Sequence, residues 1–123
     1  MYAITSYSSQ SDYDEIALFF TRLSQSHQQA DVALMRKITH QLNLLAELGP
    51  QLGMPHSKKL KGLRYSLYEL RPIPERIFYT ITTDNQIILL HHYTKRQNKT
   101  NSRQIKTAIR HYDVWLKRKE FLQ

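Results

Sequence analysis

The chain has 123 residues, enough for one domain with a sizeable core, and 41% of them are hydrophobic. It has no cysteine, which excludes disulfides, a thiol nucleophile and a cysteine-based zinc site, and which fits a reducing cytoplasm. No apolar run approaches the ~20 residues of a membrane span, the N-terminus lacks the pattern of a signal peptide, and the three glycines form no phosphate-binding loop. We therefore expect a single cytoplasmic domain over residues 1–123 that makes no membrane contact.

The first half of the sequence predicts a short strand followed by two helices. Residues 1–7 alternate as in a short opening strand. Ser11 is expected to cap a first helix, with Asp14 as its capping-box partner. Asp31 is expected to cap a second helix, which the pair Gly49-Pro50 ends. Two antiparallel helices, a helical hairpin, follow from this order.

The second half predicts three strands and a last helix. The runs 63–71, 76–82 and 86–93 are rich in aromatic and aliphatic residues, and two prolines must lie in the connection between the first two. Asp84-Asn85 suits a tight turn between the last two, since both residues tolerate positive φ. Asn101 is expected to cap the final helix. The order β-α-α-β-β-β-α predicts an α+β domain with an antiparallel sheet.

The charge of the chain is distributed unevenly. Up to His56 there are three Lys/Arg against five Asp/Glu, whereas from Ser57 onward there are fifteen against five. The formal net charge of +8 therefore belongs to the half that contains the predicted sheet and last helix. Such asymmetry indicates a polyanionic partner, and nucleic acid is the first candidate.

Basic side chains surround the predicted strands, and the hairpin geometry brings several of them together. The set is Lys58, Lys59, Lys61, Arg64, Arg71, Arg76, Lys95, Arg96 and Lys99. The strand 76–82 starts where its antiparallel neighbour ends, so Arg76 should lie beside Lys95 and Arg96 on one edge. Such cations repel one another unless a phosphate lies between them, and arginine binds phosphate in a bidentate manner. The alternative is a solvated basic surface.

Three other residue types are candidates for chemistry. Glu69 shares a strand face with Arg71 and is either a general base or, more commonly, a structural ion-pair partner. His91 and His92 are adjacent in a strand, so they point to opposite faces and cannot chelate one metal together. No histidine pair has helical metal-ligand spacing with a carboxylate, so we predict no metal site. Among the strand tyrosines, Tyr93 is the best candidate for an exposed ring that stacks on a base.

The motifs GLRYSLYELR, ERIFYTI, IILLHHYTKRQNKT and RQIKTAIRHY occur in this order in the second half of the chain. In them the chain resembles the RelE/ParE superfamily of toxins from bacterial toxin–antitoxin pairs, and it is most similar to the HigB-like, phage-derived branch. The resemblance covers the strands and last helix closely and the helical hairpin in outline. It implies a small twisted antiparallel sheet with the helical hairpin packed on it.

The resemblance also implies an activity. RelE-like members enter the ribosomal A site and cut messenger RNA without a metal or other cofactor. The 2′-OH attacks the adjacent phosphate, which gives a 2′,3′-cyclic phosphate and a 5′-OH. Such a reaction requires a base, an acid and cations that stabilise the charge developing on the phosphate.

The family motifs suggest roles for individual residues. Arg76 matches the arginine that opens the third strand and would stabilise the transition state, and Lys95 and Arg96 match the basic pair after the last strand. RelE itself has lysines where this chain has Leu67 and Glu69, so the base and acid stay open among Glu69, His92 and Tyr93. The residues expected to bind RNA are Lys58, Lys59, Lys61, Arg71, Lys99 and Arg103.

The family further implies partners. The ribosome and messenger RNA would be the target, and a cognate antitoxin, commonly a helix-turn-helix protein in this branch, would neutralise the toxin through an acidic surface. Operator DNA would be contacted only through the antitoxin. Two alternatives remain: a non-catalytic, ParE-like inhibitor of DNA gyrase, or an inactive phage remnant. The cluster of Arg76, Lys95 and Arg96 favours the nuclease, because a gyrase inhibitor does not need a phosphate site.

Overall fold

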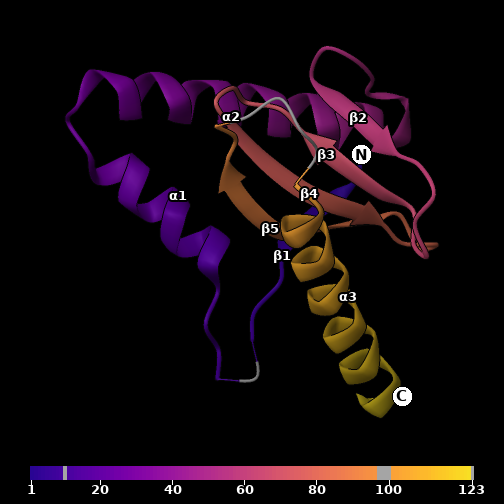
Figure 1. The fold of residues 1–123 in the computed structure, drawn as a ribbon. Helices are drawn as coiled ribbons and strands as arrows, with labels where there is room; N and C mark the ends of the chain where they lie inside the picture. Colours follow the sequence, from indigo (N-terminus) through magenta and orange to yellow (C-terminus); the bar gives the residue numbers. More distant parts are fainter. Residues whose placement is uncertain (10, 97–100, 123) are drawn as a thin grey trace.

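The computed structural model describes residues 1–9, 11–96 and 101–122, with side chains up to residue 119. The helices and strands, in chain order, are β1 (Ala3–Ser6), α1 (Glu15–Gln25), α2 (Gln29–Leu48), the short 3-10 helix η1 (Gly49–Gln51), β2 (Ser57–Leu60), β3 (Leu67–Leu70), β4 (Glu75–Ile81), β5 (Gln86–Thr94) and α3 (Ser102–Leu122). Figure 1 shows the hairpin of α1 and α2 on one side of the sheet and α3 against the other. Within these ranges, none of the helices combines the length and apolar character that crossing a membrane requires.

The five strands form one sheet in the order β1-β5-β4-β3-β2. The predicted α+β class, with its helical hairpin and C-terminal helix, is confirmed. The sheet is antiparallel from β5 to β2, as expected, but β1 joins it parallel to β5. Alternation in residues 1–7 indicates a strand but does not identify its partner. The strand β2 was not predicted, because its sequence SKKL has no apolar run and depends on pairing with β3.

The helix starts differ from the prediction at two of three positions. Asp14, not Ser11, caps α1, and its Oδ1 accepts a hydrogen bond from the backbone N–H of Ala17 at 2.9 Å. The helix α2 begins at Gln29, before Asp31. Asp31 lies in the first turn, where its negative charge interacts favourably with the helix dipole. Asn101 does accept a hydrogen bond from the backbone N–H of Gln104 at the start of α3, as expected of a cap.

Two apolar layers cover the sheet. On the face that we call the hairpin face, side chains of α1 and α2 pack on Leu70, Ile77 and Tyr79; on the other, the α3 face, Ile105 and Ala108 of α3 lie in a cluster with Phe78 and Ile88. The alternation of Ile77, Phe78 and Tyr79 between the faces is the period of a strand buried on both sides.

A β-bulge divides the pairing of β4 with β5. Phe78 lies opposite His91 and Tyr79 lies opposite Leu89, so Leu90 is the extra residue. Leu90 packs in the α3-face cluster, and the His91 ring stacks near Phe78 on the same face. His92, the next residue, turns to the hairpin face, where its ring stacks on Phe19 at a centroid distance of 4.1 Å.

Gly49 ends α2 at a position that no other residue fits. Its φ is +54°, and a Cβ atom placed there would lie 2.3 Å from the ring of Tyr2, which precedes β1. We therefore expect Gly49→Ala to lower the free energy of unfolding by at least about 2 kcal/mol, through backbone strain and the clash together. Urea denaturation measures the change.

Gly53→Ala is the matched control, because a Cβ atom at Gly53 would meet nothing within 4 Å and its φ lies outside the left-handed region. This substitution should leave the free energy of unfolding nearly unchanged. Equal destabilisation by both substitutions would contradict the packing of Tyr2 on the end of α2.

Candidate functional site

Four side chains on the α3 face meet where β3, β4 and β5 lie side by side. We call Glu69, Arg71, Arg76 and Tyr93 the arginine–glutamate cluster. The Glu69 carboxylate lies 3.7 Å from Nε of Arg71 and 3.6 Å from Nε of Arg76, both measured to Oε1. Its Oε2 accepts a hydrogen bond from the Tyr93 hydroxyl at 3.4 Å. Arg76 and Tyr93 are direct cross-strand partners, so the antiparallel register of β4 and β5 assembles the cluster.

The cluster has one more positive than negative charge. Two guanidinium groups share the single carboxylate of Glu69, and their distances to it are those of ion pairs, longer than a hydrogen bond. Within the described part of the chain, the Nε atoms of Arg71 and Arg76 are buried without a hydrogen-bond partner. Buried donors without partners are costly, so an oxyanion that reached them would be bound favourably.

The two arginines differ in exposure. The side chain of Arg76 is 8% exposed and donates through Nη1 to the backbone oxygen of Glu75, whereas that of Arg71 is 21% exposed. Arg71 is therefore the more accessible of the two to a ligand. Arg76, which the sequence made the first candidate for contact with the transition state, lies deeper and holds Glu69 in place.

The hydroxyl of Tyr93 remains protonated at neutral pH. Burial and the nearby charge of Glu69 raise the pKa of Tyr93 to about 12. Its ring stacks on Phe78 with the centroids 5.5 Å apart, which fixes its direction. Tyr93 is thus suited to donate a hydrogen bond or a proton, and it is unsuited to act as a base.

His92 lies on the other face of the sheet from the cluster. Its Nδ1 is 2.8 Å from Oε1 of Glu75, and Oε2 of the same carboxylate accepts a hydrogen bond from Thr94 at 2.8 Å. Glu75 is almost fully buried, and its role was not predicted from the sequence. The predicted hairpin could have indicated this contact. Glu75 pairs with Thr94, and Thr94 lies two residues after His92 in β5, so its side chain is on the same face of the sheet.

A cleft of about 400 Å³ opens at the end of β5, between this strand and α1. It brings together residues of both sheet faces, because the last residues of β5 extend past β1 and leave an open edge. The lining side chains are Tyr13, Glu15, Leu18, Phe19, Arg22, Glu75, His92, Tyr93 and Thr94. His92 and Tyr93 therefore both line this cleft, although their side chains lie on opposite faces of the sheet.

The remaining basic residues are placed around this region in several directions. Lys58 lies opposite Glu69 on the α3 face, whereas Lys59 points to the hairpin face, 5.9 Å from the centre of the Tyr68 ring. The backbone N–H of Lys95 donates to the oxygen of Pro74 at 3.0 Å, which puts Lys95 beside the start of β4 and near Arg76, as the hairpin predicted.

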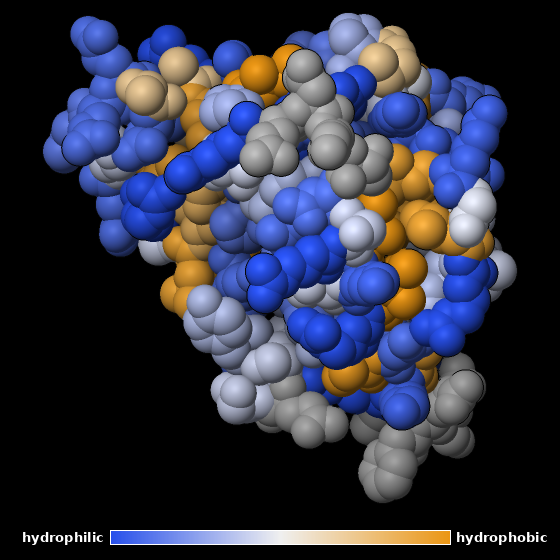
Figure 2. Space-filling model, in the orientation of Figure 1, coloured by the Kyte–Doolittle hydropathy of each residue, from blue (hydrophilic) through white to orange (hydrophobic). Residues whose placement is uncertain are grey.

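Lys61, Arg96 and Arg103 are exposed, and Lys99 lies outside the described residues. Arg64 is bound to Asp113 of α3 at 2.6 Å, so it serves the attachment of that helix. Figure 2 shows strongly hydrophilic side chains crossing the middle of the face seen in that view.

A second polar cluster was not predicted. Glu15, His91 and His111 come from α1, β5 and α3, and their ligand-type atoms gather in one place. The expectation of no metal site considered spacing within one helix and neighbours in one strand, so it could not detect a group assembled from three elements. His91 faces this group, away from the basic edge.

Comparisons with known proteins agree with the motifs. A model of the family described as "Phage derived protein Gp49-like (DUF891)" matches residues 23–113. A chain of the archaeal RelE–RelB complex from Pyrococcus horikoshii OT3 has a similar fold, with a TM-score of 0.51 and 20% sequence identity over 76% of this chain and 93% of that chain. A comparison with curated proteins gives no match. The resemblance to the RelE/ParE superfamily is confirmed.

The excess positive charge of the cluster predicts anion binding. Glu69→Gln removes the only negative charge of the cluster and keeps the shape of the side chain. We expect sulfate, a tetrahedral anion like phosphate, to raise the melting temperature of Glu69→Gln by more than that of the unaltered protein, because anion binding stabilises the folded state. Thermal denaturation over a series of sulfate concentrations measures the difference.

Glu47→Gln is the matched control, since Glu47 is exposed on α2 and its substitution changes the net charge equally. Sulfate also stabilises proteins by exclusion from their surface, and this control includes that effect. If sulfate stabilised both variants to the same extent, anion binding by the cluster would be disproved.

Proposed function

The chain belongs to the Gp49-like family of phage-derived proteins within the RelE/ParE superfamily, and we propose that it is a toxin that cleaves messenger RNA on the ribosome. The observation that carries the proposal is the pair of guanidinium groups around Glu69, one buried (Arg76) and one partly exposed (Arg71), whose buried Nε atoms have no hydrogen-bond partner in the described part of the chain. A phosphate diester is the ligand class that such an unsaturated pair of arginines suits best.

The reaction that fits is attack of a ribose 2′-OH on the adjacent phosphate. The bond from O2′ to phosphorus forms and the bond to O5′ breaks, which gives a 2′,3′-cyclic phosphate and a 5′-OH. Negative charge grows on the non-bridging oxygens, where Arg71 and Arg76 would stabilise it. Arg71, which is more exposed, would bind the phosphate directly. Arg76, which is buried beneath it, would contribute positive charge to the site.

The proton transfers fall to two neighbouring residues of β5. Tyr93, protonated because its pKa is about 12, would donate to the departing O5′. His92, which Glu75 orients, would take the proton of the 2′-OH only if the RNA crossed the open edge at the end of β5, because its ring lies on the hairpin face and the arginines lie on the α3 face. Glu69 is less suited to be the base, because its carboxylate already contacts Arg71, Arg76 and Tyr93.

The exposed cations would hold the RNA on either side of the reacting phosphate. Lys58 lies on the α3 face opposite Glu69, and Lys95 lies near Arg76. Lys61, Arg96 and Arg103 extend this basic surface. The same surface would attract the acidic side of an antitoxin, by analogy with the archaeal RelE found in a complex with RelB.

The proposal predicts ribosome-dependent cleavage that Arg71 supports. We expect purified protein to cut a defined message at codon-spaced positions only when 70S ribosomes are present. Arg71→Ala should lower the single-turnover rate about 10²–10³-fold, because it removes charge stabilisation at the phosphate. Primer extension maps the cuts and gives the rate.

Arg36→Ala, the same substitution at an exposed position of α2, should leave the rate unchanged. Arg76→Ala should also lose cleavage while keeping the fold, which circular dichroism checks. An unfolded Arg76→Ala protein would make Arg76 structural only. Cuts without ribosomes would indicate a free ribonuclease, and growth arrest without cuts would favour the gyrase inhibitor.

The proton-donor role of Tyr93 predicts a distinct result. Tyr93→Phe should lower the single-turnover rate about 10²-fold, as expected for the loss of a general acid, with little change in ribosome affinity. Because the phenol titrates far above neutrality, the rate of the unaltered protein should show no loss that is due to Tyr93 between about pH 6 and pH 9. Tyr13→Phe, at an exposed residue on the cleft rim, is the control. Equal rates for Tyr93→Phe and the unaltered protein would exclude the role.

A further inference from the structure

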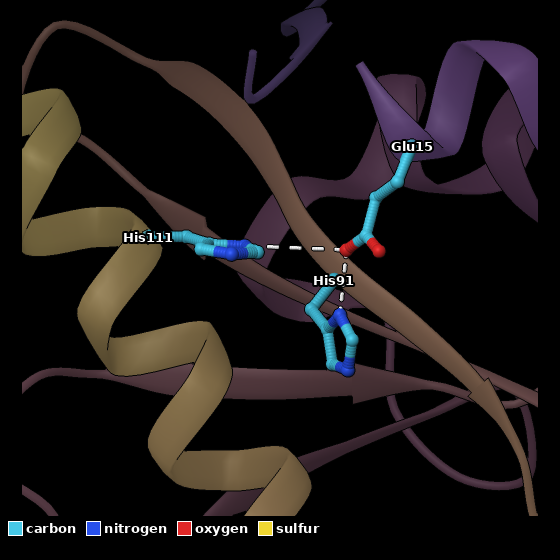
Figure 3. A group of neighbouring side chains, drawn as sticks. All are labelled: Glu15, His91 and His111. Atoms are coloured by element: carbon cyan, nitrogen blue, oxygen red, sulfur yellow. Dashed lines mark hydrogen bonds and ion pairs between the residues drawn. The ribbon is translucent and has the colours of Figure 1, made fainter. Parts of the chain in front are cut away.

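Glu15, His91 and His111 place one carboxylate and two imidazoles together, outside the arginine–glutamate cluster (Figure 3). Glu15 is the first residue of α1, His91 lies in β5 and His111 lies in α3. One potential ligand atom of each residue lies within 4.8 Å of the other two, and all three residues are half-buried. Nδ1 of His91 is 2.5 Å from Oε1 of Glu15, and Nδ1 of His111 lies 4.0 Å from the same oxygen.

We propose that these three residues bind a divalent transition-metal ion, with Zn²⁺ as the best fit. Two imidazoles and one carboxylate are a ligand set that Zn²⁺ uses, with a fourth position left for water. Mg²⁺ and Ca²⁺ prefer oxygen ligands and are excluded by the two nitrogens.

Hydrogen bonds outside the three ligands orient both histidines for this purpose. Nε2 of His91 is bonded to the side-chain oxygen of Gln104, and Nδ1 of His111 lies 2.7 Å from the backbone oxygen of Leu90. Amide and backbone carbonyl oxygens accept hydrogen bonds, so Nε2 of His91 and Nδ1 of His111 each carry a hydrogen. A neutral imidazole has one N–H, so Nδ1 of His91 would offer its lone pair to an ion in place of its present bond to Glu15. At His111 the free lone pair is on Nε2, whereas the nitrogen 4.0 Å from Glu15 is Nδ1, so this ring would turn to bind an ion. Metal-binding histidines are commonly held by such bonds from their second nitrogen.

The distances require the ligands to move. Zinc ligands lie about 2.0–2.2 Å from the ion, so neighbouring ligand atoms are about 3.3 Å apart in a tetrahedral site. Glu15 and His91 would separate by about 1 Å from their present 2.5 Å contact. Glu15 is at the end of a helix and His91 is beyond the last residue of β5 that β1 pairs with, so neither is restrained by a paired neighbour strand on that side.

The charges at the site also favour a cation. Burial raises the pKa of Glu15, but the hydrogen bond and the charge of His91 outweigh it and hold this pKa below its usual value, so the carboxylate is ionised at neutral pH. The ion would take the place of the hydrogen bond between Nδ1 of His91 and Glu15. Arg110 is the nearby cation that opposes binding.

The bound ion would connect three elements that otherwise meet through side chains. It would fix the first turn of α1 to β5 and α3, next to the cleft that Glu15 lines. Its role would be structural, and the proposal does not depend on the proposed nuclease activity.

The test is a titration of the metal-stripped protein with Zn²⁺, monitored by calorimetry, and a separate titration with Co²⁺, monitored by its visible absorbance. We expect one ion per chain, a tetrahedral Co²⁺ spectrum and a higher melting temperature with metal. His91→Gln and His111→Gln should each weaken binding at least ~10-fold, and Gln104→Ala should weaken it ~10-fold with the stoichiometry unchanged.

The matched control is the double variant His40→Gln/His56→Gln. These two rings also lie close together, 5.9 Å between centroids, but among the residues that the structure describes they form no cluster with a carboxylate. The double variant should bind as the unaltered protein does. The proposal is overturned if the unaltered protein shows no saturable binding, or if binding survives His91→Gln and His111→Gln and disappears in the control. The measurement of saturable binding by the unaltered protein needs no variant, so it tests the proposal even if a variant misfolds.

Discussion

The pairing of β4 with β5, and the bulge at Leu90 within it, determines where the candidate functional side chains of these two strands lie. The regular part of the ladder sets Arg76 opposite Tyr93 and Glu75 opposite Thr94. The bulge places Leu90 and His91 on the α3 face, so that His92 points to the hairpin face. A ladder without the extra residue would shift one side of β5 by one position and exchange the faces of these side chains. The arrangement at both sites therefore depends on a single irregularity in the central hairpin.

The arginine–glutamate cluster lowers the stability of the folded protein. Removing charges from water is expensive, and Glu69 compensates only part of that cost for two arginines. The buried Nε atoms without partners add to it. A protein selected for stability alone would gain by replacing these groups with apolar residues, as neighbouring positions of β3 and β4 already are. The unsaturated charge is consistent with binding of a phosphate that completes the cluster.

The sequence was sufficient wherever one local rule or one hairpin decided the outcome. Asp84-Asn85 indicated the turn that aligns β4 with β5, and Asn85 has the positive φ that the turn requires. From that turn alone, the proximity of Arg76 and Lys95 followed. The failures lie where the deciding contact is distant. The partner of β1 is far along the chain, and the β2 sequence carries two exposed lysines in place of an apolar pattern.

The sequence identified most residues of the candidate site, but it did not indicate which of them are buried or on which face of the sheet each one lies. Glu69, Arg71, Arg76 and Tyr93 were all named from the sequence, yet the depth of Arg76 depends on packing that no spacing rule encodes. Glu75 was missed because a glutamate beside an arginine at a strand start resembles any surface ion pair. The group of Glu15, His91 and His111 could not be inferred at all, since its members come from three elements whose contact depends on the complete fold.

The two clusters are linked through three consecutive residues of β5. His91 contacts Glu15 of α1, His92 contacts Glu75 and Phe19, and Tyr93 contacts Glu69. Glu15 and Phe19 lie on one side of the first turns of α1, so the helix touches the environments of both histidines. The position of α1 therefore sets the width of the cleft that His92 and Tyr93 line. Any group that binds between Glu15 and His91 would act on that cleft through the helix, because the three strand residues cannot move independently of one another.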